Sequence, residues 1–146
     1  MRALVAGQLF FVHVRVTIVE PSARIGARHA MERKPEIGAK ILIFKEAPLQ
    51  EILSGRKTLE ARGKKYKAGI YWLGCKGVIH GIARLAPGTL VESDKDWERL
   101  REEHLIQTPS PPYPKTYLFE ILSCEKRNIP FTHVKGAVNI VRYRGK

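Results

Sequence analysis

Cysteine is scarce in this chain, and its few cysteines and histidines are not grouped. Among 146 residues there are two cysteines, Cys75 and Cys124, and both lie in apolar runs that we expect to form buried strands. Two lone cysteines in a domain of this size favour a reducing compartment over a disulfide framework. The sequence has no Cys-x-x-Cys pair and no pair of histidines with metal-ligand spacing. It therefore predicts no zinc site, no other metal site and no cofactor.

Long apolar runs are also absent. The longest, near Leu9–Val14, contains His13 and is far too short to cross a bilayer. We therefore expect an intracellular, cytoplasmic protein that makes no membrane contact. Import into an organelle is the alternative, and it depends on the nature of the N-terminal segment.

Acidic residues are the third shortage. The chain has 26 Lys and Arg against 14 Asp and Glu, a formal net charge of +12. Residues 39–146 alone hold 20 cations and 11 acids, so the basic character does not come from the N-terminal segment. Such a charge indicates a polyanionic partner, because each neutralised phosphate releases condensed counterions. Nucleic acid is the partner that this charge predicts. A charge that only keeps the protein soluble, or a ribosome-like structural role, is the alternative.

The first 38 residues differ from the rest. Residues 2–31 hold four arginines, no lysine and one acid, Glu20. This composition is typical of an organelle transit peptide. A disordered tail or a true start at Met31 fits as well, and the β-branched run Leu9–Val19 is a candidate for an extra strand. We expect a leader or tail, so the predicted organisation is an extension over 1–38 and one domain over 39–146.

From Lys40 onward the pattern predicts short strands and two helices. Apolar spacing predicts helices over Ala47–Leu53, closed by Gly55, and over Asp94–Ile106. Strands are expected at Ile41–Phe44, Thr58–Arg62, Gly69–Gly74, Gly77–Leu85, Thr116–Glu125 and Ala137–Tyr143. Gly81, inside the fourth of these, indicates a bulge or a close approach. Because strands and helices do not alternate regularly, we expect an α+β fold, a mixed β-barrel of about five to six strands capped by two helices.

The densest charge lies in and just after Gly55–Arg62. Residues 56–67 hold six cations and one acid. Strand alternation puts Glu60 and Arg62 on one face, and Lys57 lies at the junction of helix and strand. Lys57 and Arg62 can hold a phosphate, while Glu60 orients them or accepts a hydrogen bond from a base amino group. The alternative is an exposed face with a weak Glu60–Arg62 ion pair.

Neighbouring residues complete the predicted nucleic-acid site. Tyr66 lies among lysines, where its ring can stack on a base. His104, near the end of the second helix, either lines the cleft or is a surface residue favoured by the helix dipole. Tyr113, in a proline-rich loop, is either a lid or has no role. The expected nucleic-acid-binding residues are Lys57, Thr58, Glu60, Arg62, Lys64, Lys65, Tyr66 and His104.

Several stretches together resemble one known family. "LQEILSGRKTLEAR" is similar to the signature of the activating-signal-cointegrator homology (ASCH) domain, a helix ending in Gly-x-Lys-Thr followed by Glu-x-Arg. "GVIHGIARL", "DWERLREEH" and "YLFEILSCEKRNIPFTHVKGAVNIVRY" resemble a barrel strand, a helix and the closing segment of that family. The resemblance covers residues 40–144. It implies a PUA-like β-barrel with a cleft lined by the Lys, Glu and Arg of the motif.

The same resemblance implies roles in RNA binding, RNA metabolism or the control of transcription and translation. Some small members are amidohydrolases that act on acetylated cytidine, with a threonine three residues after the lysine. Here Glu60 occupies that position and Thr58 follows Lys57 directly, so a nucleophilic hydroxyl is missing from the expected register. No counterpart of the catalytic glutamate is found near His104.

Three functions remain open. We expect an RNA-binding module, taken to be a monomer, and favour a non-catalytic role. The alternative is a hydrolase, either an N4-acetylcytidine amidohydrolase or a ribonuclease, using Lys57 and Glu60 as acid and base. The third is a protein-interaction domain whose basic face meets an acidic partner.

Overall fold

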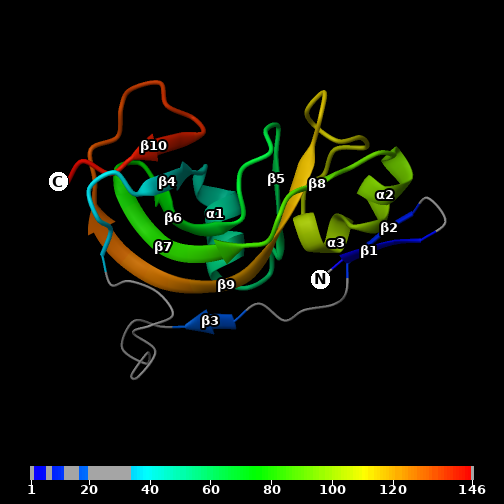
Figure 1. Cartoon of the computed structure of the whole chain (residues 1–146), viewed down its shortest axis with the longest axis horizontal. Coiled ribbons are helices and arrows are strands. Elements are labelled where there is room, and N and C mark those ends of the chain that lie inside the picture. Colours follow the sequence, from blue (N-terminus) through cyan, green and yellow to red (C-terminus); the bar gives the residue numbers. More distant parts are fainter. Residues whose placement is uncertain (1, 6–7, 12–16, 20–33, 146) are drawn as a thin grey trace.

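A single curled sheet carries the domain, in the strand order β10–β4–β6–β7–β9–β3, and two further short strands, β5 and β8, pair with β9 (Figure 1). The structure is a computed structural model that describes residues 2–5, 8–11, 17–19 and 34–145, with side chains for 34–145. The strands of this sheet are β3 (Thr17–Val19), β4 (Lys40–Ile43), β5 (Leu59–Arg62), β6 (Gly69–Cys75), β7 (Val78–Leu85), β8 (Thr89–Leu90), β9 (Tyr117–Pro130) and β10 (Ile140–Arg142). Parallel and antiparallel pairs both occur, so the predicted α+β fold with mixed strand directions is confirmed. The sheet is strongly curled, but its end strands, β10 and β3, do not pair with each other within the described part of the chain, and the expected barrel is not closed.

Three short helices accompany the sheet: α1 (Glu46–Leu53), α2 (Asp94–Arg99) and α3 (Arg101–His104). The sequence predicted one helix where α2 and α3 lie. The interruption falls at Leu100, whose backbone leaves helical geometry at φ −98° and ψ 11°. Leu100 and Trp97 are both buried and share a cluster with Leu59 of β5, and the turn at Leu100 keeps both side chains in that cluster.

The sheet curls around α1, as Figure 1 shows. Leu49, Ile52 and Leu53 of α1 belong to one buried cluster with residues of β4, β6, β7 and β9. The opposite face of β4 carries Ile41 and Ile43, which lie in a second cluster covered by the link between β9 and β10. Because both faces of this strand are buried, its sequence is a continuous apolar run, residues 41–44, and does not alternate between apolar and polar residues.

Two backbone irregularities shape β7. The β6–β7 hairpin turns through Lys76 and Gly77, both at positive φ (52° and 78°), as a two-residue loop of this kind requires. At Gly81 the register of β7 against β9 shifts, and a Cβ there would lie 2.9 Å from Leu53 and 3.0 Å from the Glu125 carbonyl oxygen. The predicted bulge or close approach at Gly81 is therefore confirmed.

Part of the N-terminal segment forms strands. β1 (Arg2–Val5) and β2 (Gln8–Phe11) make an antiparallel hairpin. β3 pairs in parallel with Ser123–Glu125 of β9, which corresponds to the extra-strand alternative within Leu9–Val19. Residues 12–16 of that predicted strand, and Met31, lie outside the described residues.

Two predicted strands differ in their bounds, since β9 is longer than expected and β10 begins at Ile140 instead of Ala137. β9 continues to Pro130, because Ile129 and Pro130 pair with the first residues of β7. Pro130 is tolerated there, since a strand end needs no donated ladder bond. β8 was not predicted. It has only two residues, which is too short for an alternating pattern.

Candidate functional site

The helix-to-strand junction is built as the sequence predicts. α1 ends at Leu53, and Gly55, at φ 83°, donates its backbone N–H to the carbonyl of Ile52 at 3.0 Å. The chain then crosses to β5, with the Lys57 N–H bonded to the Glu51 carbonyl and the Thr58 N–H to the Glu103 carbonyl. This crossing fixes Lys57 between α1 and α3.

Lys57, Glu60 and Arg62 form one compact group, which we call the motif cluster. Lys57 Nζ lies 3.8 Å from Glu60 Oε1, and Arg62 Nε donates to Glu60 Oε2 at 2.6 Å. All three side chains are buried, with 2%, 6% and 7% of their surface exposed. Glu60 and Arg62 lie on one face as predicted, and Lys57, whose direction the strand alternation left open, joins them. The alternative of an exposed face is wrong because all three residues are buried, although the Glu60–Arg62 ion pair that it included is present.

The Arg62 guanidinium is held from two further sides. It donates to the Ile43 carbonyl at 2.8 Å and lies over the ring of Phe44, 4.6 Å from its centroid. Burial of a charge is tolerated only where partners replace water. Arg62 has a carboxylate, a carbonyl and an aromatic face, so the cluster is electrostatically satisfied as it stands.

Lys57 also donates to the carbonyl of His104. Burial lowers the pKa of Lys57, against the opposing effect of the Glu60 and Glu51 carboxylates. The nearest carboxylate, Glu60, is already bonded to Arg62. The motif cluster therefore keeps charged side chains away from water. Its carboxylate, Glu60, is bonded to Arg62, and its amine, Lys57, is bonded to the His104 carbonyl.

His104 lies inside the protein, fully buried beside Trp97. The two rings stack with centroids 3.7 Å apart. The N–H of Ile106 donates to Nδ1 at 2.9 Å, so Nδ1 is the acceptor and Nε2 carries the proton that it shares with the Trp97 carbonyl at 2.8 Å. Burial lowers the pKa of His104 to about 4. Both ring nitrogens are thus occupied by hydrogen bonds within the protein. His104 contacts Lys57 through its backbone carbonyl and not through its ring.

Tyr66 is half-buried and faces the core. Its ring stacks on Phe119 at 6.0 Å and lies 6.5 Å from Tyr71. Its hydroxyl is buried without a hydrogen-bond partner among the described residues, and burial raises its pKa. One face of the ring is thus taken by the protein itself.

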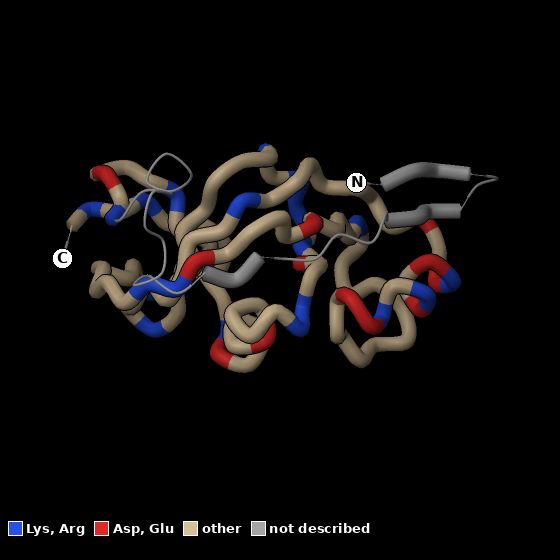
Figure 2. Tube along the Cα trace, turned by 90° about the horizontal axis from the view of Figure 1, so that it is seen from below, with Lys and Arg blue, Asp and Glu red and all other residues tan. Residues whose placement is uncertain are grey.

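The lysines after β5 are placed differently. The segment Gly63–Ala68, which we call the basic turn, carries Lys64, Lys65 and Lys67, and all three are exposed. They make no ion pair within the described part of the chain. Figure 2 shows Lys and Arg spread along the whole trace, with Asp and Glu most closely grouped in the lobe of α2 and α3. The basic turn is therefore available to an anionic partner.

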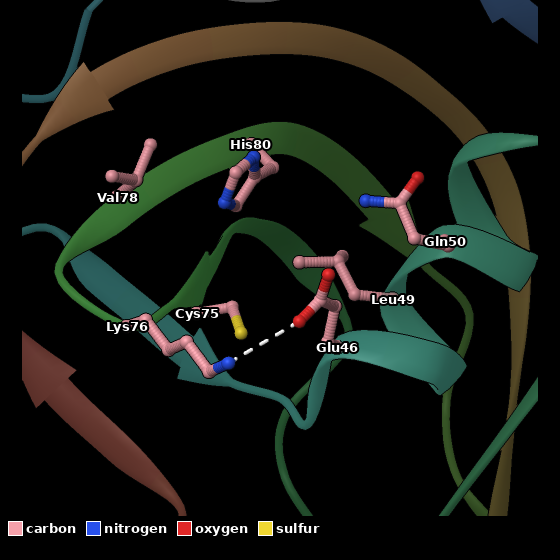
Figure 3. Close-up of a pocket in the computed structure, with 7 residues that line it drawn as sticks. All are labelled: Glu46, Leu49, Gln50, Cys75, Lys76, Val78 and His80. Carbon is pink, nitrogen blue, oxygen red and sulfur yellow. Dashed lines mark hydrogen bonds and ion pairs between the residues drawn. The ribbon is translucent and has the colours of Figure 1, made fainter.

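A cavity of about 220 Å³ lies elsewhere, between α1 and the β6–β7 hairpin (Figure 3). Leu49 and Cys75 line its apolar side, and His80 lies on its wall. Lys76 is paired with Glu46 at 3.2 Å across it, so its cation is matched by a carboxylate. This cavity contains none of the predicted site residues.

The described residues carry neither a cluster suited to a metal ion nor a helix suited to a membrane. No group of three or more His, Cys, Asp or Glu side chains there is arranged to hold a metal ion. No described helix is long and apolar enough to span a bilayer. Cys75 and Cys124 are both buried and unpaired, and burial raises the pKa of Cys124 to about 12.

Comparison with known proteins identifies the fold. No protein-family model and no curated protein sequence matches the chain. The crystal structure of a mutant form of ZmASCH from Zymomonas mobilis is similar, with a TM-score of 0.59 and 15% sequence identity. The match covers 76% of this chain and 92% of that protein. The expected resemblance is thus confirmed at the level of structure: the chain has the fold of the ASCH domain, a PUA-like and strongly curled mixed sheet with short helices.

Proposed function

We propose that this chain binds RNA through the basic turn, with the motif cluster acting as the rigid support of that turn. One observation carries the proposal. Lys64, Lys65 and Lys67 are exposed and unpaired immediately after a strand whose own charges are buried and matched. Unmatched lysines on a short turn suit phosphate contacts, because their counterions are released on binding.

The roles of the predicted residues then divide. Lys64 and Lys65 contact phosphates, whereas Thr58, which is half-buried, lies at the opposite end of β5 from the basic turn and takes no part in this contact. Lys57, Glu60 and Arg62 hold β5 against α3 and β4 and add positive potential beneath the basic turn. Tyr66 and His104 pack under the surface.

The hydrolase alternative has less support. General acid–base catalysis needs a group that is free to exchange a proton with the substrate. Glu60 is bonded to Arg62 at 2.6 Å, and Lys57 is bonded to the His104 carbonyl. Both groups would have to leave these partners before reacting, so binding is the function that the geometry favours.

The experiment compares two charge-matched double variants in binding to a short labelled single-stranded RNA. Lys64→Ala with Lys65→Ala removes two exposed cations from the basic turn, and Lys45→Ala with Lys135→Ala removes two exposed cations elsewhere. We expect only the first to reduce the salt dependence of binding, by a slope of about 1.4 for two lost phosphate contacts. Equal losses in both variants would mean that overall charge, and not the turn, binds RNA.

A further inference from the structure

Tyr113 has a large aromatic side chain that is exposed to solvent, although its backbone is fixed by hydrogen bonds. It is 44% exposed and lies in the loop between α3 and β9. Its N–H donates to the Thr116 hydroxyl at 3.0 Å, and its carbonyl accepts from the same hydroxyl at 3.2 Å. Thr116 is buried, and Pro111, Pro112 and Pro114 restrict the loop. The ring is therefore preorganised as well as exposed.

The Tyr113 ring lies against the basic turn. A Cβ added at Gly63 would meet two atoms of the ring at 3.1 Å, so the ring rests directly on the glycine backbone. Lys64 and Lys65 follow Gly63, and Lys115 lies two residues beyond Tyr113, all of them exposed. Cations beside an open aromatic face are the arrangement by which proteins bind single strands, the cations on phosphates and the ring on a base.

A shallow depression of about 250 Å³ adjoins Tyr113, between the proline-rich loop and the start of α2. Glu92, Asp94 and Ser110 line it, and Asp94 accepts a hydrogen bond from the Ser110 hydroxyl at 3.1 Å. Carboxylates repel phosphate but accept hydrogen bonds from the exocyclic amino groups of bases. The depression suits an uncharged ring that carries an amino group.

We propose that Tyr113 stacks on one unpaired, amino-bearing base of a single-stranded RNA, whose edge enters this depression while the adjacent phosphates lie on Lys64 and Lys65. This inference rests on the proposed RNA-binding function and names its ligand class. Duplex RNA, whose bases are already stacked and paired, has no base to offer Tyr113 and binds through charge alone.

The test measures binding of labelled oligocytidylate and oligouridylate at several salt concentrations, using wild type, Tyr113→Ala and Tyr113→Phe. We expect Tyr113→Ala to weaken oligocytidylate binding about tenfold without changing its salt slope, because stacking involves no phosphate. Tyr113→Phe keeps the ring and should bind as wild type does. Wild type should bind oligouridylate more weakly, since uracil has no amino group for Glu92 or Asp94.

The outcomes separate this inference from the proposed function. If Tyr113→Ala binds oligocytidylate as tightly as wild type while Lys64→Ala with Lys65→Ala binds more weakly, the stacking role is wrong and the proposed function stands. Equal wild-type affinity for the two oligonucleotides would overturn the assignment of the depression. If wild type binds neither, both proposals fail.

Discussion

His104 shows how strongly burial sets the chemistry of a single residue here. Its ring is neutral and stacked on Trp97, and its pKa is lowered to about 4. An unfolded histidine has a pKa near 6.5. As pH falls from about 6.5 to about 4, His104 therefore becomes protonated in the unfolded chain but stays neutral in the folded protein, and the free energy of unfolding decreases. We expect this residue to remove about 3 kcal/mol of unfolding free energy over that window, measured by urea denaturation.

A matched variant isolates this effect. The control is His80→Gln, which changes a histidine that is half-buried on the cavity wall and lies outside the Trp97 stack. His104→Gln should be less stable at neutral pH and flatter between pH 6.5 and 4. A His104→Gln profile as steep as that of wild type would show that other groups cause the loss.

The Arg62–Glu60 pair is the second residue-scale test. Removing one member of a buried pair leaves an uncompensated charge, at a cost of about 3–5 kcal/mol. We therefore expect Arg62→Met to lower the free energy of unfolding toward the lower end of that range, because Glu60 loses its 2.6 Å partner but keeps Lys57 at 3.8 Å. The control is Arg56→Met, which removes an exposed arginine from the same segment. A loss below about 1 kcal/mol for Arg62→Met would contradict the buried-pair description.

Spacing along the chain predicted which charged residues meet, but not that they are buried. Alternation places Glu60 and Arg62 on one face of β5, and the structure agrees. Burial depends on what covers that face, and the covering groups, such as Phe44, come from segments distant in sequence. A sequence pattern therefore predicts that a short charged strand is exposed when the residues that bury it belong to other segments of the chain.

At the scale of elements, the β6–β7 turn offers a stabilising change. Lys76 has φ 52°, a left-handed conformation that costs a residue other than glycine or asparagine roughly 1 kcal/mol. Asn-Gly is the preferred pair for such a turn. Lys76→Asn should therefore raise the free energy of unfolding by about 0.5–1 kcal/mol, seen as a higher Tm.

That substitution also removes the ion pair with Glu46. Both side chains are largely exposed, at 77% and 69%, so the pair contributes little. Glu46→Gln breaks the pair without touching the turn, and its Tm should stay near that of wild type. A Tm for Lys76→Asn below that of Glu46→Gln would show that backbone strain at Lys76 is not the dominant effect.

Elements with strong local signals were predicted well. The helix at α1 and the strands β4, β6 and β7 fall within a few residues of their expected bounds. The end of β9 and the whole of β8 depend on pairing with strands elsewhere, which periodicity does not report.

At the scale of the whole molecule, charge is divided between two regions. Residues 92–103, which include α2 and most of α3, hold six acids and three cations, whereas the other residues of 34–145 hold 17 cations and six acids. A polyanion is repelled by the first region and attracted by the second. The basic turn and Tyr113 lie where the two regions meet, which favours phosphates on one side of the ring and a base on the other.

The sequence alone predicts only one side of this boundary between the two charged regions, the lysines of the basic turn. The lysines of residues 64–67 stand out by composition, whereas the proline-rich loop predicts for Tyr113 either a lid or no role. Their contact joins Gly63 to Tyr113, 50 positions apart, and exists only because β5 and β9 pair side by side. Local patterns carry no information on such a contact.

The most direct test of the central claim is a titration of the isotopically labelled chain with a short single-stranded RNA, followed by amide chemical shifts. We predict that the largest changes fall on the basic turn, residues 63–68, and on the loop around Tyr113. Residues around the cavity of Figure 3, such as Lys76 and His80, should change little. Changes centred on that cavity or on the β9–β10 link, with the basic turn unaffected, would contradict the account.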